Sequence, residues 1–106
     1  MIPKICIAAI NAKYFGRKTE FGNIDVSREW NWCDEQSKNL INFLKKKPQD
    51  FILSNGKSYT AKDMIKFAFN YFKIDYTNYI FTNKKYYRYK DIKIKSSDFK
   101  ACLKRN

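Results

Sequence analysis

Histidine is missing from this sequence, and glycine, proline and cysteine are scarce: the 106 residues include three Gly, two Pro and three Cys. Without histidine, the widely separated Cys6, Cys33 and Cys102 can form neither a zinc-binding pattern nor a Cys/His nucleophile. We expect these cysteines to be reduced, buried thiols. The sequence therefore predicts no metal site and no catalytic residue of this kind.

A long apolar run is missing as well. The stretch that follows Met1 is interrupted by Asn11 and Lys13, which makes it too short and too polar for a signal-peptide core or a membrane span. No membrane partner is expected. The sequence predicts a soluble, cytoplasmic protein.

Acidic residues are few beside the basic ones, with 10 Asp and Glu against 22 Lys and Arg and a formal net charge of +12. Residues 1–44 hold 6 of the basic and 5 of the acidic residues, so residues 45–106 carry the excess with the remaining 16 and 5. Such an excess attracts polyanions, including nucleic acids, nucleoside diphosphates and acidic membrane surfaces. A drift of the composition toward Lys, Asn and Ile explains much of the charge without any ligand.

The length leaves room for one small domain. Hydrophobic residues make up 44% of the chain and include nine Phe, eight Tyr and two Trp, more than a disordered segment carries. We therefore expect one globular unit, a single partial domain over residues 1–106.

Helical patterns occur in three places. Residues 3–15 have apolar side chains at helical spacing with Gly16 as a C-cap, and residues 34–47 place Leu40, Ile41 and Leu44 on one face before Pro48. A third helix is expected from Thr60, where Asp63 completes a capping box, to about residue 73.

Short strands are expected between these helices, at residues 20–24, 51–53 and 79–81, with a further strand at 92–95 and a last helix at 97–103. A turn at residues 54–56 should close the strand at 51–53. Alternating helices and strands predict an α/β or α+β arrangement. The apolar faces outnumber what so few strands can cover, which is typical of a piece of a larger fold.

Three motifs, in order, resemble the GDP-mannose 4,6-dehydratase family of extended short-chain dehydrogenase/reductases. G-N-I-D-V-S-R-E-W at residues 22–30 is similar to the family's G-N-L-D-x-x-R-D-W, and D-F-I-L-S-N-G-K-S-Y-T at 50–60 is similar to D-[FY]-V-I-A-T-G-x-x-[HY]-[ST]. Y-Y-R-Y-K-D-I at 86–92 resembles [FY]-F-R-P-x-E-V, and Asp98 falls where the family has G-D-P. The resemblance implies the C-terminal, sugar-nucleotide-binding part of such an enzyme.

Four residues carry the binding role that the resemblance implies: Asn23, Arg28, Arg88 and Asp91. An arginine offers a planar fork of donors that suits a pair of pyrophosphate oxygens, and Asp91 can accept from ribose hydroxyls. Arg28 and Arg88 would then meet on one diphosphate. Each residue also has a plain alternative: a surface Arg28, an Arg88–Asp91 ion pair worth about 0.2–0.5 kcal/mol, and simple turn chemistry at Asn23.

The family's catalytic parts are missing from the chain. By resemblance the intact enzyme is a lyase that uses NADP to convert GDP-mannose to GDP-4-keto-6-deoxymannose and water, through a Gly-rich Rossmann turn and a Tyr-x-x-x-Lys pair. Tyr86 and Lys90 have that spacing, but they lie inside the third motif and follow no Gly-rich strand. We therefore expect a fragment that binds GDP-mannose or a related nucleotide sugar, holds no cofactor itself, and has catalytic residues elsewhere, for instance on a separate Rossmann-half chain.

Two other functions stay open at this point. The tyrosines and lysines of the basic half are typical of a small, aromatic-rich module that stacks single-stranded nucleic acid. The chain can also be a non-functional remnant, since Tyr89 stands where the family has Pro, and Asp91 is one methylene shorter than the family's Glu.

Overall fold

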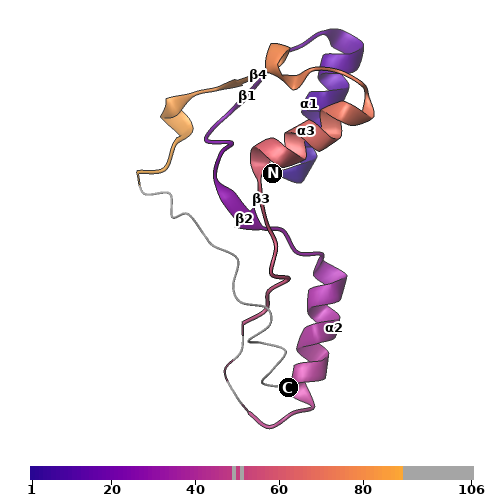
Figure 1. Cartoon of the computed structure of the whole chain (residues 1–106), viewed down its shortest axis with the longest axis vertical. Helices are drawn as coiled ribbons and strands as arrows, with labels where there is room; N and C mark the ends of the chain where they lie inside the picture. Colours follow the sequence, from indigo (N-terminus) through magenta and orange to yellow (C-terminus); the bar gives the residue numbers. More distant parts are fainter. Residues whose placement is uncertain (49, 51, 90–106) are drawn as a thin grey trace. The chain divides into compact units, whose positions relative to one another are not determined.

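The computed structural model describes residues 1–48, 50 and 52–89. The helices are α1 (Ile2–Phe15), α2 (Cys33–Leu44) and α3 (Ala61–Tyr71), and the strands are β1 (Thr19–Phe21), β2 (Ser27–Glu29), β3 (Ser58–Thr60) and β4 (Ile80–Thr82) (Figure 1). Two 3-10 turns, η1 (Tyr76–Asn78) and η2 (Lys84–Tyr86), flank β4. This mixture confirms the predicted α/β fragment.

The chain folds as two compact units. The first unit contains residues 1–27 and the described residues from 59 onward, and the second contains the described residues from 28 to 58. The boundary falls within β2 and within β3, which pair in a two-stranded sheet. The single partial domain expected over residues 1–106 stays a prediction.

Helix α1 ends at Phe15 as the sequence predicts and begins one residue earlier than predicted, at Ile2. Pro3 lies in the first turn, and Gly16 ends the helix in the left-handed conformation with φ 61°, its N–H donating to the carbonyl of Ala12. The buried face consists of Ile5 and three alanines. Because alanine side chains are small, the backbone of α1 can lie close to the elements that cover it.

Helix α3 begins at the predicted capping box. The hydroxyl of Thr60 accepts from the backbone N–H of Asp63 at 3.1 Å, and the Asp63 carboxylate accepts from the Thr60 N–H at 2.9 Å. These bonds satisfy N–H groups that have no partner within the helix. The Thr60 hydroxyl, followed by the Thr60 backbone N–H, lowers the pKa of Asp63 below its ordinary value of 3.8.

Replacing Thr60 by alanine should lower the free energy of unfolding by about 1 kcal/mol, as for other lost N-caps. Because folding lowers the pKa of Asp63, the stabilisation from its carboxylate is present above about pH 3.8 and is lost as the pH falls through the folded-state pKa. The difference in unfolding free energy between wild type and Thr60→Ala should therefore be smaller in acid. Urea denaturation at pH 7 and pH 3 measures it, and a difference that grows in acid would contradict the capping box.

Strands β1 and β4 pair in parallel, with Thr19, Glu20 and Phe21 opposite Ile80, Phe81 and Thr82. The strands predicted at 20–24 and 79–81 are thus confirmed, with bounds shifted to 19–21 and 80–82. Strand β1 ends early because Asn23 forms a side-chain turn, its Oδ1 accepting from the N–H of Asp25 at 3.1 Å.

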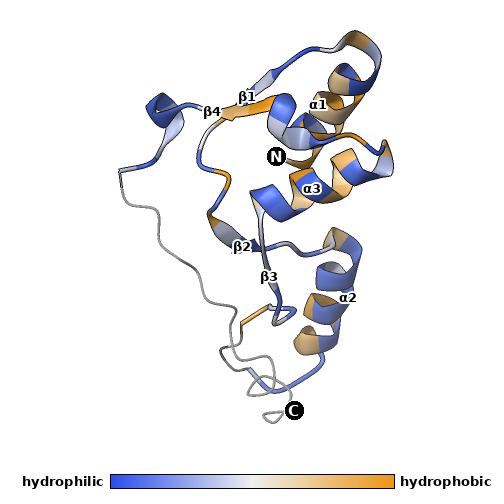
Figure 2. Ribbon diagram, turned by 45° about the horizontal axis from the view of Figure 1, so that its top comes forward, coloured by the Kyte–Doolittle hydropathy of each residue, from blue (hydrophilic) through white to orange (hydrophobic). Residues whose placement is uncertain are grey.

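The core of the first unit lies among α1, α3 and β1, and Figure 2 shows hydrophobic residues along both helices. Phe21, Ile65 and Phe69 are its largest fully buried side chains. The apolar face predicted for the third helix is confirmed, since Ile65 and Phe69 are buried and Met64, Ala68 and Phe72 pack against the core.

In the second unit the helix predicted at residues 34–47 is present as α2, whereas the strand predicted at 51–53 is not formed at its described residues. The face of α2 made by Leu40, Ile41 and Leu44 is exposed, at 44%, 55% and 79% of each residue's surface. Residues 52 and 53 form no strand and are exposed. The turn that should close this strand is present, with Gly56 at φ 71°.

The described cysteines are free thiols, as predicted, but Cys6 and Cys33 are exposed rather than buried. Cys6 follows Ile5 on α1 and so falls beside the buried face of that helix. Cys102, the strand predicted at 92–95 and the helix predicted at 97–103 lie outside the described residues. Among the helices described here, none has the length and apolar character that a membrane span requires.

Candidate functional site

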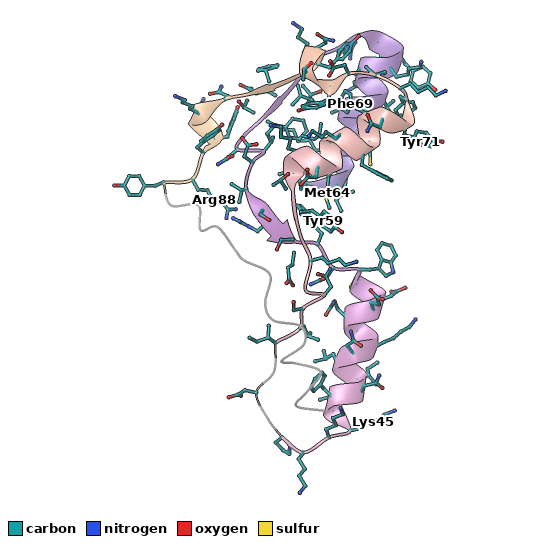
Figure 3. All side chains as sticks on the ribbon, viewed as in Figure 1. Lys45, Tyr59, Met64, Phe69, Tyr71 and Arg88 are labelled. Carbon is teal, nitrogen blue, oxygen red and sulfur yellow. The ribbon has the colours of Figure 1, made fainter. Side chains whose placement is uncertain are left out.

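The carboxyl ends of β1 and β4 meet at one edge, because the two strands are parallel. Gly22 and Asn23 follow β1 at this edge, while Asn83 and the turn η2 follow β4. Arg88 lies beyond η2 on the same segment (Figure 3). In open α/β sheets, ligands bind outside the carboxyl ends of the strands. The structure therefore brings the first and third motifs together where such a site is expected, and we call these five parts the carboxyl edge.

The first and third motifs touch at Gly22. A Cβ atom at this position would lie 3.1 Å from the carbonyl oxygen of Tyr86 and 3.2 Å from its Cβ. These distances are shorter than ordinary van der Waals contacts, so a larger residue would push the two segments apart. Glycine at position 22 thus permits the close approach of the two motifs.

The loop after Asn23 is held against the start of α3. The carbonyl of Ile24 accepts from the backbone N–H of Lys62 at 2.9 Å, and the Lys62 ammonium lies 3.5 Å from the Asp25 carboxylate. The exposed ion pair contributes little by itself. The half-buried Asn23 uses its carbonyl oxygen in the turn, which leaves its Nδ2 hydrogens to donate to a ligand.

Cations gather on the β4 side of the carboxyl edge. Lys84 and Lys85 lie in η2 and Arg88 follows, and all three are exposed. Asn83 caps η2, its Oδ1 accepting from the N–H of Lys85 at 2.9 Å. A diphosphate approaching this segment would meet three positive side chains.

Arg28 belongs to the second unit, where it lies half-buried in β2. That Arg28 and Arg88 bind the same diphosphate therefore stays a prediction. Asp91 lies outside the described residues, and its predicted role is likewise untested. Of the four predicted site residues, the structure places Asn23 and Arg88 on segments that meet at the carboxyl edge.

The second motif contacts the end of the first within the second unit. The hydroxyl of Ser54 donates to the Glu29 carboxylate at 2.6 Å, and the Asn55 amide donates to the carbonyl of Trp30 at 3.0 Å. The turn is closed locally, since the Gly56 N–H donates to the Ser54 hydroxyl at 3.0 Å. The second motif thus anchors the residues that directly follow Arg28.

Two residues that join β1 to the carboxyl edge, Glu20 in β1 and Asn83, were not predicted from the sequence. Asn83 carries a weak signal, since an asparagine ahead of a tight turn often caps it. Glu20 has none, because its hydrogen-bond partner Asn83 lies 63 positions away.

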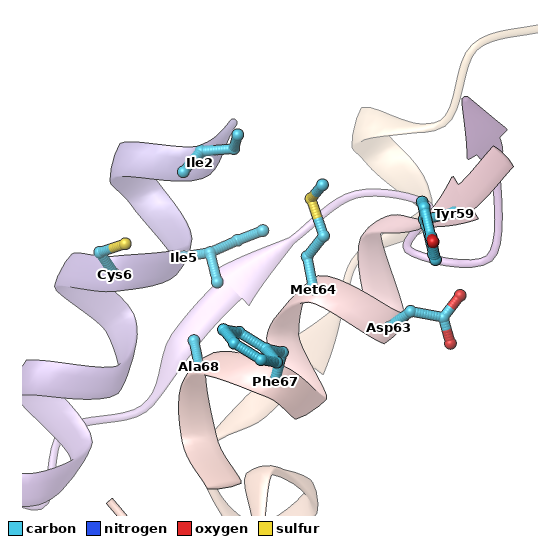
Figure 4. Close-up of a pocket in the computed structure, with 8 residues that line it drawn as sticks. All are labelled: Ile2, Ile5, Cys6, Tyr59, Asp63, Met64, Phe67 and Ala68. Carbon is cyan, nitrogen blue, oxygen red and sulfur yellow. The ribbon is translucent and has the colours of Figure 1, made fainter. Parts of the chain in front are cut away.

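A separate apolar groove of about 500 Å³ lies between α1 and α3. In Figure 4, Ile2, Ile5 and Cys6 on α1 face Met64 and neighbouring side chains on α3. Its charged lining residue is Asp63, an anion whose carboxylate is engaged in the capping box. A groove with this lining suits an apolar group and would repel a diphosphate.

The fold and the carboxyl edge define a fragment of an α/β protein. The family model described as GDP-mannose 4,6 dehydratase matches residues 1–105, and the chain belongs to this family. The curated "GDP-mannose 4,6 dehydratase 1" of Arabidopsis thaliana is 26% identical over 72 residues, which cover 67% of this chain and 20% of that protein. The aligned part of the chain thus covers about a fifth of the length of this relative.

The residues present do not fit a nicotinamide dinucleotide. A Rossmann site needs closely spaced glycines directly after a strand. The chain has three glycines: Gly16 ends a helix, Gly22 contacts Tyr86, and Gly56 lies in the turn of the second motif. No step involving NADP is therefore assigned to this chain.

Proposed function

We propose that this chain binds the GDP part of a nucleotide sugar, as the substrate-binding portion of a GDP-mannose 4,6-dehydratase. The observation that carries the proposal is the carboxyl edge, where the motifs at residues 22–30 and 86–92 come together at Gly22 and Tyr86, beside Asn23 and the segment of Arg88. Membership of the family supplies the ligand class.

Each site residue has a distinct role in this proposal. Arg88 donates to diphosphate oxygens through its guanidinium, with the Lys84 and Lys85 ammonium groups adding attraction at longer range. Asn23 donates from Nδ2. Arg28 supplies a second guanidinium, and Asp91 accepts from the ribose hydroxyls.

The parent reaction converts GDP-mannose to GDP-4-keto-6-deoxymannose and water, and its lyase chemistry with NADP requires residues that this chain lacks. We propose that a separate chain with the Gly-rich Rossmann half supplies them. The cytoplasm is the compartment we propose, which agrees with the free thiols of Cys6 and Cys33 because disulfides are rare there.

Calorimetric titration with GDP, GDP-mannose and guanosine tests the binding proposal. GDP and GDP-mannose should bind at least about 10-fold more tightly than guanosine, because hydrogen bonds to charged groups contribute about 1.5–3 kcal/mol each. Equal affinity for all three, or no binding of any, would defeat the proposal.

One observation favours a nucleic-acid-binding module as the second candidate. Tyr86, Tyr87 and Tyr89 are exposed, Tyr89 at 99%, and stand among the cations of η2 and Arg88. Such side chains can stack bases while the cations follow the phosphates. A single-stranded oligonucleotide that binds more tightly than GDP, with an affinity that falls steeply between 50 and 200 mM salt, would favour this candidate. Indifference to both ligands would leave a non-functional remnant.

A further inference from the structure

Glu20 and Asn83 form a side-chain hydrogen bond that joins β1 to the segment after β4. The Asn83 amide donates to the Glu20 carboxylate at 2.5 Å, and both residues are half-buried. A hydrogen bond to an ionised acceptor is stronger than one between neutral groups. This bond closes a long loop of the chain at the carboxyl edge.

Asn83 makes two further hydrogen bonds with different elements. Its backbone N–H donates to the carbonyl of Phe21 at 2.9 Å, which extends the parallel ladder beyond β4. Its Oδ1 accepts from the N–H of Lys85 at 2.9 Å, which fixes the first turn of η2. Asn83 therefore sets the direction in which the chain leaves β4 toward Arg88.

The contact between Gly22 and Tyr86 fixes the same segment a second time. Gly22 immediately precedes Asn23, and Tyr86 stands two residues before Arg88. Two attachments, one at each end of η2, hold this turn against the end of β1. The backbone around the two ligand-binding residues is thus defined without any ligand.

We propose that Glu20 and Asn83 are positioning residues for diphosphate binding, which hold the segment of Arg88 at the strand edge occupied by Asn23. The inference rests on the proposed function. A segment that is already ordered loses less conformational entropy when the ligand binds, so the affinity is higher. Neither residue needs to touch the ligand.

The sign of the Glu20→Ala effect separates positioning from simple electrostatics. If electrostatics alone acted, removing a carboxylate near an anion site should tighten GDP binding, because it removes a repulsion between like charges. Positioning predicts the opposite, a loss of about 10-fold in affinity, because the segment of Arg88 must then be ordered on binding. Glu20→Gln keeps an oxygen that can accept from Asn83 and should restore most of the affinity. Glu35→Ala, at an exposed glutamate of α2, is the charge-matched control and should leave the affinity within about 2-fold.

The Arg88→Ala background provides the second readout. If Glu20 acts through Arg88, its substitution should cause no further loss of GDP affinity once Arg88 has been removed. The double variant Glu20→Ala/Arg88→Ala should then bind GDP as tightly as Arg88→Ala alone does. Tighter binding by Glu20→Ala, or a full additional loss in the Arg88→Ala background, would overturn the positioning role. Arg88→Ala alone tests the proposed function, so the two ideas can fail separately.

Hydrogen exchange without ligand completes the test. In Glu20→Ala the amide of Lys85 should exchange about 10-fold faster, because its cap is no longer held, while the amide of Phe69 in α3 should be unchanged. Unchanged exchange at Lys85 would overturn the inference whether or not GDP binds.

Discussion

Replacing Phe69 by alanine should remove about 3–5 kcal/mol of stability, the usual cost of deleting a buried phenylalanine. Phe69, which Figure 3 labels on α3, is 1% exposed and lies in the core of the first unit with Phe21 and Ile65. Domains of this size are stabilised by only about 5–15 kcal/mol. Urea denaturation followed by circular dichroism should therefore show a much lower midpoint, or an unfolded protein at room temperature.

Phe67→Ala is the matched control for this prediction. Phe67 stands two residues earlier on the same helix but is 82% exposed, at the apolar groove. Its replacement should change the unfolding free energy by less than about 0.5 kcal/mol. Similar losses for both variants would mean that α3 buries a different face from the one described.

Replacing Arg88 by alanine should weaken GDP binding by about 10- to 150-fold, which corresponds to the 1.5–3 kcal/mol of hydrogen bonds to a charged group. The side chain is exposed and outside the core, so the fold should be unaffected. Calorimetry measures the affinity, and the urea midpoint verifies that the variant is folded.

Two variants separate the guanidinium fork from charge alone. Arg17→Ala removes the same charge from an exposed position that precedes the amino end of β1, the opposite end from the carboxyl edge, and should leave GDP affinity within about 2-fold. Arg88→Lys keeps the charge but loses the planar fork, so its affinity should fall between those of wild type and Arg88→Ala. Equal losses of GDP affinity for Arg17→Ala and Arg88→Ala would mean that the chain attracts GDP through its net charge and not through a specific contact with Arg88.

The helices of the first unit could be predicted because their signals are local. The Gly16 cap of α1 and the Thr60–Asp63 capping box of α3 each involve residues within a few positions of one another. The apolar spacing within α3 likewise identified Ile65 and Phe69 as core residues. Such short-range patterns are determined by helix geometry alone.

The pairing of β1 with β4 could not be predicted in the same way. Each strand has three residues, and the partners lie about sixty positions apart, so no local pattern specifies their parallel register. The hydrogen bond between Glu20 and Asn83 depends on that register and was equally hidden. By contrast, Asn23 and Arg88 were predicted from the resemblance of their motifs to the family and not from any periodicity, and their binding role stays a prediction.

Apolar patterns in the second unit show how far such local signals extend. Leu40, Ile41 and Leu44 do form one face of α2, as helical spacing requires, but that face is exposed. Residues 52 and 53 have strand-like side chains, yet they form no strand, since a strand also needs a neighbour with which to pair its backbone groups. In both places the pattern gives the shape of the segment, whereas burial depends on what lies beside it.

The most direct test of GDP binding at the carboxyl edge is the change in amide ¹H–¹⁵N chemical shifts during a titration with GDP. The account predicts the largest changes at Gly22, Asn23 and residues 83–88, with Met64 and Phe67 at the apolar groove unaffected. Saturating changes centred on the groove, or no changes at the carboxyl edge with GDP in excess, would contradict it.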